Sequence, residues 1–207
     1  MINKKLLAVT SIAAVIASSS AFAKTEGNYF GTNIIRSDIE NKASDVNIKD
    51  HQIGFGADYK YAINFNGFFV APGVFVERNN TEAKISENDV YLPGDSSSVE
   101  ANTKYRYGIK SDIGYDITND LSAYLTGGLS RNNYQFTLQY EYGGVTEQYK
   151  ESGNKIGYFY GLGLAYNINK DISLNTEYNM QKIDYKFDGE KVKTDLSVAK
   201  IGVSYHF

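Results

Sequence analysis

Alternation of apolar and polar residues is the feature that most restricts how this chain can fold. In residues 104–117 (KYRYGIKSDIGYDI), mostly Tyr and Ile fill every second position, while Lys, Arg, Asp and Gly fill the positions between. Residues 52–63, 156–168 and 200–207 repeat the pattern. Because successive side chains of a β-strand point to opposite faces, each segment is predicted to be a strand with one apolar and one polar face.

Eight strands are predicted, joined alternately by short turns and long polar loops. The related segments YAINFNGF (61–68), YDITNDLS (115–122) and YNINKDIS (166–173) each join a strand end to Asn, Asp or Gly residues, which favour tight turns. The long loops are expected at about 37–50, 78–102, 140–154 and 187–193. The predicted strands are 27–37, 50–63, 67–77, 103–117, 121–139, 154–168, 172–186 and 193–207.

The first, third and fifth of these strands depart from regular alternation. Residues 67–77 carry apolar side chains at both odd and even positions and contain Pro72. In residues 121–142 the apolar positions change from odd to even numbers. This change predicts either a bulge near Gly127–Gly128 or a strand that projects above a membrane.

Residues 1–23 have the features of a cleaved secretory signal peptide. Lys4 and Lys5 precede an uncharged apolar stretch at 6–17, and Ala21-Phe22-Ala23 forms a cleavage site of the A-x-A type. The apolar stretch is shorter than the roughly 20 residues of a membrane-spanning helix. With no Cys in the chain, a lipid anchor is not expected. Residues 24–207 are therefore predicted to form one exported domain.

Alternation fits a soluble barrel, with its apolar face inward, and an outer-membrane barrel, with that face toward lipid. Three features favour the membrane barrel. Glycines on the polar faces would make room in a narrow interior for large side chains such as Lys60, Arg106 and Lys110. Tyr residues gather near strand ends, and the final strand ends on the aromatic Phe207. A barrel in hydrocarbon has no open edge, so its last strand must pair with its first. The glycines are Gly54, Gly56, Gly108, Gly114, Gly157, Gly161, Gly163 and Gly202.

Two groups of residues acquire roles in such a barrel. Tyrosines beside the short turns are predicted to form an aromatic belt at the membrane boundary; they are Tyr59, Tyr61, Tyr115, Tyr166 and Tyr205. Charged residues on the interior faces are predicted to pair as a plug, because eight strands leave an interior that side chains fill. They are Asp58, Lys60, Arg106, Lys110, Asp112, Glu177 and Lys200. The alternative is a charged constriction that selects small ions.

The signal peptide, the alternating strands, the turns of the YDITNDLS type and the ending GVSYHF resemble the Gram-negative eight-stranded outer-membrane barrels, the group of opacity proteins and outer-membrane-protein-A-like barrels. The resemblance covers residues 24–207. It implies an all-β, eight-stranded antiparallel up-and-down transmembrane barrel in the outer membrane, surrounded by lipid, with both termini in the periplasm. It also implies that Ile201, Val203, Tyr205 and Phe207 form the signal that the barrel-assembly machinery reads during biogenesis.

No catalytic, metal or cofactor site is predicted. The chain has two His and no Cys. His51 beside Asp50 resembles the Asp/His pair of barrel proteases but is expected to be an exposed loop residue, and His206 is expected to be a polar interior residue. With a net charge of −3, the chain has no basic footprint for nucleic acid.

The predicted function is therefore that of a monomeric, non-enzymatic porin-family surface antigen or adhesin, which binds host or extracellular ligands through its long loops, supports envelope structure, or does both. In the longest loop, 78–102, the candidate contact residues are Glu87, Asp89, Tyr91 and Leu92. The alternatives are a small porin-like channel for ions or small solutes and, with less support, a soluble lipocalin-like ligand carrier.

Overall fold

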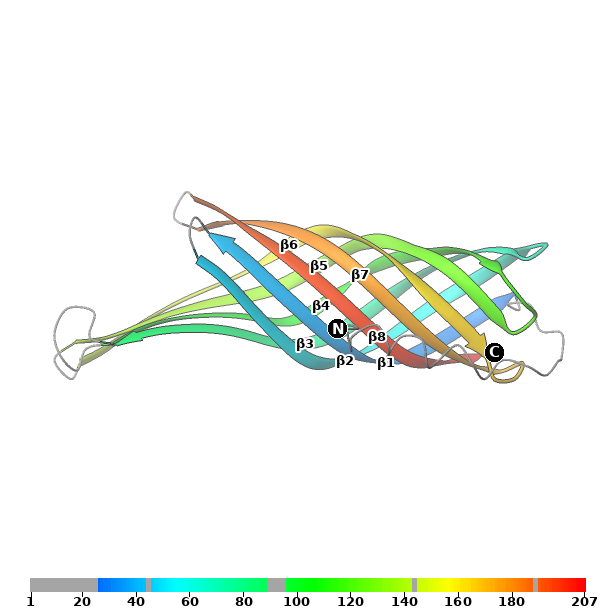
Figure 1. Ribbon diagram of the computed structural model, residues 1–207, viewed down its shortest axis with the longest axis horizontal. Coiled ribbons are helices and arrows are strands. Elements are labelled where there is room, and N and C mark those ends of the chain that lie inside the picture. Colours follow the sequence, from blue (N-terminus) through cyan, green and yellow to red (C-terminus); the bar gives the residue numbers. More distant parts are fainter. Residues whose placement is uncertain (1–25, 44–45, 89–95, 143–144, 188–189) are drawn as a thin grey trace, which may run out of the picture.

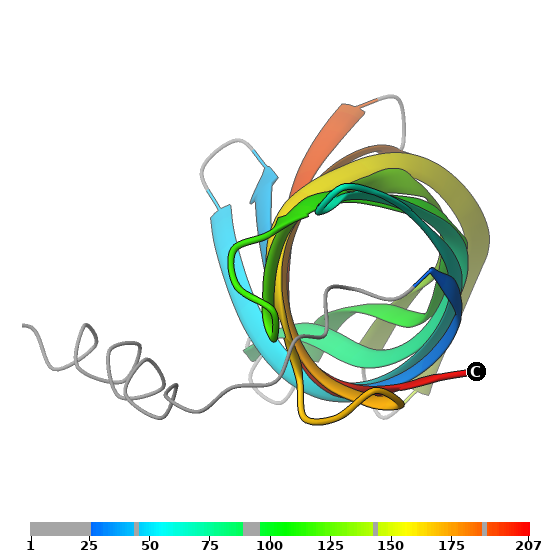
Figure 2. The same cartoon turned by 90° about the vertical axis from the view of Figure 1, so that its right-hand side faces the viewer.

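The computed structural model describes residues 26–43, 46–88, 96–142, 145–187 and 190–207. They form eight antiparallel strands that close into a barrel in chain order, with β8 paired to β1 (Figures 1 and 2). The predicted all-β, eight-stranded antiparallel barrel is thereby confirmed. Within the described ranges, no helix has the length and apolar character needed to cross a membrane. The strands are β1 (Gly27–Ala43), β2 (Val46–Phe65), β3 (Phe68–Asn88), β4 (Ser96–Asp116), β5 (Leu121–Tyr142), β6 (Val145–Asn167), β7 (Ile172–Phe187) and β8 (Glu190–His206).

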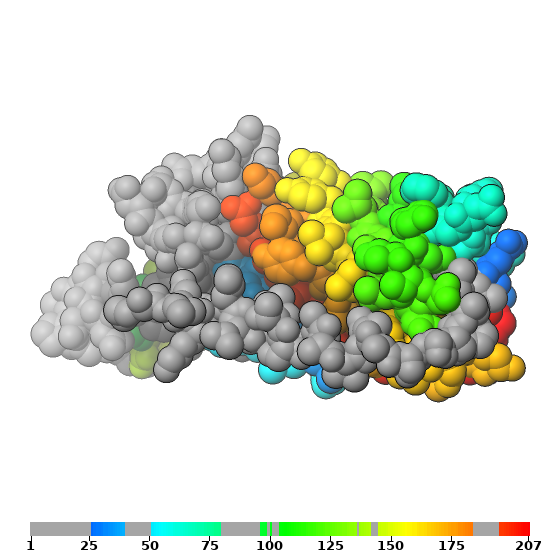
Figure 3. Space-filling model, turned by 45° about the vertical axis from the view of Figure 1, so that its right-hand side comes forward, coloured from blue at the N-terminus to red at the C-terminus, as the bar shows by residue number. Residues whose placement is uncertain are grey.

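The outer wall of the barrel is apolar and its interior is largely polar. Along β6, Leu162 and Leu164 are exposed on the outside, whereas Gly163 and Ala165 are buried. The same alternation gives an outer surface of Ile, Leu, Val, Phe and Tyr on every strand, and β4 to β7 appear as slanting bands of that wall in Figure 3. A soluble barrel has the reverse arrangement, so this wall is suited to lipid.

The three repeated segments form the short turns at one end of the barrel, here called the short-turn end. Asn66 and Gly67 have φ of 52° and 90°, the left-handed conformations that a two-residue hairpin turn requires. In the other two turns Thr118 Oγ1 and Asn169 Oδ1 accept hydrogen bonds from main-chain N–H groups two and three residues later. The last residue, Phe207, exchanges two main-chain hydrogen bonds with Asn28 at this end.

At the opposite end, here called the long-hairpin end, the strands run far beyond their predicted ends. The predicted loops 37–50, 78–102, 140–154 and 187–193 are wrong, because most of their residues continue the strand ladders. In the longest, β3 and β4 pair from Thr81–Thr103 to Asn88–Ser96. Polar residues can form these hairpins because main-chain pairing in water needs no apolar face. In these hairpins the alternation is less regular than in the wall, and along β5 its apolar positions change from odd to even numbers.

Pairing between neighbouring strands is uneven around the barrel. β2 and β3 pair only between Phe55–Arg78 and Phe65–Phe68, and β6 and β7 only between Phe159–Gln181 and Asn167–Ser173. Between these paired stretches and the long-hairpin end, the barrel divides into two four-stranded sheets. The sheet of β3, β4, β5 and β6 reaches further and is called the tall leaf (Figure 1). The sheet of β7, β8, β1 and β2 is called the short leaf.

The predicted bulge near Gly127–Gly128 is wrong. Gly127 pairs with Ser111 on one side and Tyr160 on the other, and the register continues without interruption. The register shifts lie instead between Arg78 and Thr81 in β3 and between Thr103 and Arg106 in β4. β5 instead projects beyond the barrel wall, which was the other predicted alternative (Figure 1). Its apolar residues change from odd to even positions along this strand.

Candidate functional site

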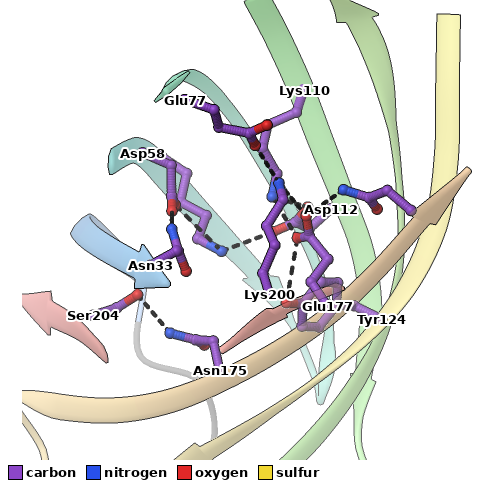
Figure 4. Close-up of polar contacts among 12 residues, drawn as sticks. Asn33, Asp58, Glu77, Lys110, Asp112, Tyr124, Asn175, Glu177, Lys200 and Ser204 are labelled. Atoms are coloured by element: carbon purple, nitrogen blue, oxygen red, sulfur yellow. Dashed lines mark hydrogen bonds and ion pairs between the residues drawn. The ribbon is translucent and has the colours of Figure 1, made fainter. Parts of the chain in front are cut away.

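Eight charged side chains form one connected cluster across the barrel interior. Figure 4 labels Asp58, Glu77, Lys110, Asp112, Glu177 and Lys200 of this cluster. They project inward from β2, β3, β4, β7 and β8, and each side chain is at most 11% exposed. The four cations balance the four anions. The members are Asp58, Lys60, Glu77, Arg106, Lys110, Asp112, Glu177 and Lys200.

Asp112 and Glu177 hold the first half of the cluster together. Lys60 Nζ lies 2.8 Å from Asp112 Oδ2 and 3.8 Å from Asp58 Oδ2. Lys110 Nζ lies 3.3 Å from Asp112 Oδ1 and 2.6 Å from Glu177 Oε2. Two lysines and three carboxylates therefore alternate across the interior, so that each buried charge faces an opposite one.

Glu77 joins the second half of the cluster. Its Oε1 lies 2.6 Å from Lys200 Nζ, which is also 2.9 Å from Glu177 Oε1. Arg106 Nη1 donates a hydrogen bond of 2.8 Å to Glu77 Oε2, and its Nε donates one of 3.1 Å to Gln181 Oε1. The Arg106 guanidinium also lies 4.5 Å from the ring centroid of Phe159, on its face, where the attraction of a cation to a ring adds to the ion pair.

Neutral side chains add hydrogen bonds to the carboxylates of Asp58 and Glu177. Asn33 Nδ2 donates to Asp58 Oδ1 at 2.8 Å, and Asn179 Nδ2 donates to Glu177 Oε1 at 2.7 Å. The Tyr124 hydroxyl donates to Glu177 Oε2 at 3.5 Å. The bonds fix the carboxylates in place, which favours a rigid core over loosely solvated charges.

The structure brings all seven predicted interior charges together and adds Glu77, which the sequence reasoning missed. Glu77 was overlooked because residues 67–77 looked apolar on both faces. Two signals could have found it. Phe69, Ala71 and Phe75 share its odd numbering and are buried. The seven predicted residues also hold four cations and three anions, and a buried cluster with one unpaired cation is costly.

Side chains fill the interior around the cluster. A cavity of about 10 Å³, lined by residues that include Lys60 and Tyr124, leaves room for roughly one water molecule. Apolar side chains pack on both sides of the cluster along the barrel, with Tyr29 and Phe69 toward the short-turn end and Ile35 and Leu196 toward the long-hairpin end.

The inward glycines make room for other neighbours than those predicted. A Cβ atom at Gly114 would collide with the Phe69 ring, and one at Gly163 would collide with the Tyr124 ring. Gly157 and Gly202 are closest to Gln181 and Asn33. The expectation that these glycines accommodate Lys60, Arg106 and Lys110 is therefore wrong, because the three cations point toward their carboxylates.

The predicted aromatic and terminal residues lie on the outer wall. Tyr59, Tyr61, Tyr115 and Tyr205 are exposed near the short-turn end, and Tyr166 is half-buried. In β8, Ile201 and Val203 are exposed on the same face as Tyr205, whose ring stacks 6.1 Å from that of Phe207. Their roles at a membrane boundary and in assembly stay predictions.

The remaining predicted residues lie apart from the cluster. Asp89, Tyr91 and Leu92, like residues 1–23, lie outside the described residues, and Glu87 is paired with Ser97 in the β3–β4 ladder. His51 is exposed on β2, opposite Asp38 of β1. His206 stacks on Tyr29 at 4.7 Å, at the short-turn end. In the part of the chain that the structure describes, no group of three or more His, Cys, Asp and Glu side chains could hold a metal ion.

Comparisons with known proteins agree with this architecture. The family model described as outer membrane protein beta-barrel domain matches residues 7–207. None of the curated proteins compared with the chain matches it. Similar solved structures include the outer membrane protein OprG from Pseudomonas aeruginosa, with 14% identity, a TM-score of 0.52, and coverage of 91% of this chain and 99% of that chain.

Two further structures are similar. The outer membrane protease OmpT from Escherichia coli has 9% identity and a TM-score of 0.51, with 92% of this chain and 99% of that chain covered. The attachment invasion locus protein Ail of Yersinia pestis has 18% identity and a TM-score of 0.49, with 88% and 100% covered. At such identities the likeness to OprG and OmpT concerns the fold alone.

Proposed function

Because this chain belongs to the outer membrane protein β-barrel domain family, we propose that it is a non-enzymatic surface protein that binds host or extracellular ligands through its long hairpins. The long-hairpin end faces outward, and the short-turn end, with both chain termini, faces the periplasm. A monomeric barrel surrounded by lipid presents the tall leaf outside the cell. A supporting role in the envelope is compatible with the same rigid barrel.

The closed, charge-balanced interior is the observation that carries this proposal. With a cavity of about 10 Å³ inside the cluster, the barrel offers little room for a solute. The parts of the chain that project beyond the barrel wall are then the parts available for binding, and the tall leaf is the largest of them (Figure 1). The channel alternative has less support, because opening a path would separate several buried ion pairs.

The positions of the two histidines support a non-enzymatic role. His51 lies on the β2 segment at the long-hairpin end, and His206 lies at the opposite end of the barrel. A general acid or base must lie within hydrogen-bond reach of the proton that it transfers. The two imidazoles cannot serve one site across the barrel.

The biogenesis proposals concern the two ends of the chain. Residues 1–23 act as a cleaved signal peptide, so mass spectrometry of the mature protein should show a chain that begins at Lys24. We propose that the barrel-assembly machinery recognises the outward-facing residues at the end of β8. These residues are Ile201, Val203, Tyr205 and Phe207.

An adhesion assay tests the surface function. The protein is displayed on a non-adherent Gram-negative bacterium beside a variant in which residues 82–102 and 134–153 are each replaced by a short Gly/Ser turn. This variant removes the tall leaf above the pairs Thr81–Thr103 and Asn133–Asn154. A control variant shortens the β7–β8 hairpin instead. Heat-modifiable gel migration checks that all three are folded in the outer membrane.

We expect the bacteria to bind host cells or extracellular matrix with the wild-type and control proteins and to lose binding without the tall leaf. If correctly inserted wild-type protein gives no binding, or if the variant without the tall leaf binds equally well, the proposed surface function is wrong.

A further inference from the structure

The tall leaf has an apolar side that differs from the lipid-facing side of the barrel. Within the wall, the odd-numbered Leu125 and Leu129 of β5 are exposed, whereas the even-numbered Ser130 and Asn132 are buried in the interior. Beyond Asn132 the even positions become apolar, with Tyr134, Leu138 and Tyr140. The odd positions become polar, with Gln135, Thr137 and Gln139. The apolar side of the leaf therefore continues the interior face of the barrel; we call it the inner face.

β6 adds exposed residues to this inner face. The β5–β6 register places Tyr149 opposite Leu138 and Glu147 opposite Tyr140. Val145, Tyr149 and Tyr140 are 64%, 60% and 45% exposed. Large apolar groups on a projecting sheet have no lipid to contact, and contiguous exposed apolar surface commonly marks an interaction site.

The same part of β6 is a sheet edge. Residues 145–158 pair with β5 on one side, while pairing with β7 begins only at Phe159. Half of the main-chain N–H and C=O groups of this segment therefore face away from β5, with no described strand beside them. A long edge of this kind is a template for another extended chain.

The charged residues of β6 indicate which side chains an added strand would carry. Glu147 and Glu151 lie on the inner face, one on each side of Tyr149 along the strand, and the Tyr149 hydroxyl donates a hydrogen bond of 3.4 Å to Glu147 Oε2. Cross-strand neighbours on one face contribute to pairing when their charges are opposite or when both are apolar. The complementary strand therefore carries a basic, an apolar and a basic residue at alternate positions.

We propose that the β6 edge, Val145–Tyr158, binds an extended segment of a partner protein as an added strand, with a basic–apolar–basic face opposite Glu147, Tyr149 and Glu151. This inference rests on the proposed surface function, because the tall leaf must be outside the cell to meet such a partner. A second copy of the chain is a poorer occupant, because its β6 edge brings the same two carboxylates.

The probe is a peptide of nine residues, Lys-Thr-Val-Thr-Lys-Thr-Val-Thr-Lys, in which Lys or Val alternates with Thr. Full-length protein is refolded into lipid nanodiscs, and fluorescence anisotropy of the labelled peptide measures Kd. In the variant Glu147→Gln/Glu151→Gln we expect Kd to rise about fivefold, from the loss of two cross-strand charge pairs. The matched control Gln148→Lys/Ser152→Lys changes the net charge equally on the opposite face and should leave Kd within about twofold.

N-methylated peptides test the strand geometry directly. In one peptide the Lys and Val amides are methylated, and in the other the Thr amides. Because alternate amides of an added strand point toward the sheet edge, one methylated peptide should lose binding and the other should keep it. Equal effects of the two methylation patterns, or of the two protein variants, would overturn the proposal.

Two further outcomes separate this inference from the proposed function. If bacteria adhere through the tall leaf while nanodisc-embedded protein does not bind the peptide, the strand-addition proposal is wrong and the surface function stands. If sedimentation shows dimers that Glu147→Gln/Glu151→Gln strengthens and the peptide does not dissociate, the edge serves a second copy and the proposal is also wrong.

Discussion

Replacing Glu77 by Gln should destabilise the barrel strongly, because it leaves a buried guanidinium without its anion. Among the described residues, Glu77 is the anion that pairs with Arg106, at 2.8 Å, and both side chains are at most 3% exposed. Lys200 would keep Glu177 at 2.9 Å, but Arg106 would keep only the neutral Gln181 and the rings of Phe75 and Phe159.

The magnitude follows from the geometry. A pair of unit charges at about 4 Å attracts by about 4 kcal/mol at an effective dielectric constant near 20. Removing the carboxylate also removes the cost of burying it, so the net loss is smaller than the sum over its two ion pairs. For a buried pair that loses one partner, the free energy of unfolding should fall by about 3–5 kcal/mol.

Urea unfolding in lipid vesicles measures this change. The chain contains no Trp, so far-UV circular dichroism and heat-modifiable gel migration follow the transition. The control Glu147→Gln removes an exposed carboxylate and should change the free energy of unfolding by less than about 0.5 kcal/mol. The double variant Glu77→Gln/Arg106→Gln removes both partners and should recover about half of the loss. A folded Glu77→Gln barrel that loses less than about 1 kcal/mol, or a double variant with no recovery, would refute the reasoning.

Three other predictions address the interior and the barrel closure. Purified protein in planar bilayers should show no stable, large open steps in single-channel recordings; such steps would reject the plug. Gly163→Leu should lower the free energy of unfolding by about 1–3 kcal/mol, since its side chain would displace the Tyr124 ring, whereas Gly127→Ala, with ordinary contacts, should be nearly neutral. Deleting Phe207 removes two main-chain hydrogen bonds to Asn28 and the stacking on Tyr205, so refolding into vesicles, followed by gel migration, should slow relative to wild type.

Sequence reasoning succeeded where one solvent acts on each face of a strand. In the wall, lipid selects apolar residues on one side and the narrow interior selects small or polar ones on the other, so Ile109 and Lys110 could be assigned to opposite faces. It failed where that selection ends. Residues such as Thr81 and Thr103 pair in the tall leaf through their main chains, which leaves little trace in the pattern of side chains.

Glu77 shows a different limit. Its odd-numbered position indicated an inward side chain. Its role, however, depends on Arg106 of β4 and Lys200 of β8, which are on other strands. Each strand could be read separately as a row of inward and outward residues. The pairing of charges across the interior is set by how the strands close into a ring, which no single segment encodes.

We propose that the outer edge of the membrane lies where the apolar residues of β5 change sides. Its ladder with β6 has no register shift, so the same side of the strand faces the interior from Ser122 to Asn132 and continues beyond. Apolar residues nevertheless change sides between Leu129 and Tyr134. Arg131 lies at this level on the outer face, between Tyr107 and Ile156, where a cation suits the headgroup region.

Both register shifts of the tall leaf, after Arg78 and after Thr103, lie near this level. Below it, the apolar side is explained by lipid. Above it, the apolar residues turn to the face that lipid never reaches, and polar residues occupy the face that would have met it. The added strand proposed above would account for that second apolar surface. The unpaired β6 edge beside Tyr149 is the part of the leaf where such a contact would also complete the main-chain hydrogen bonding.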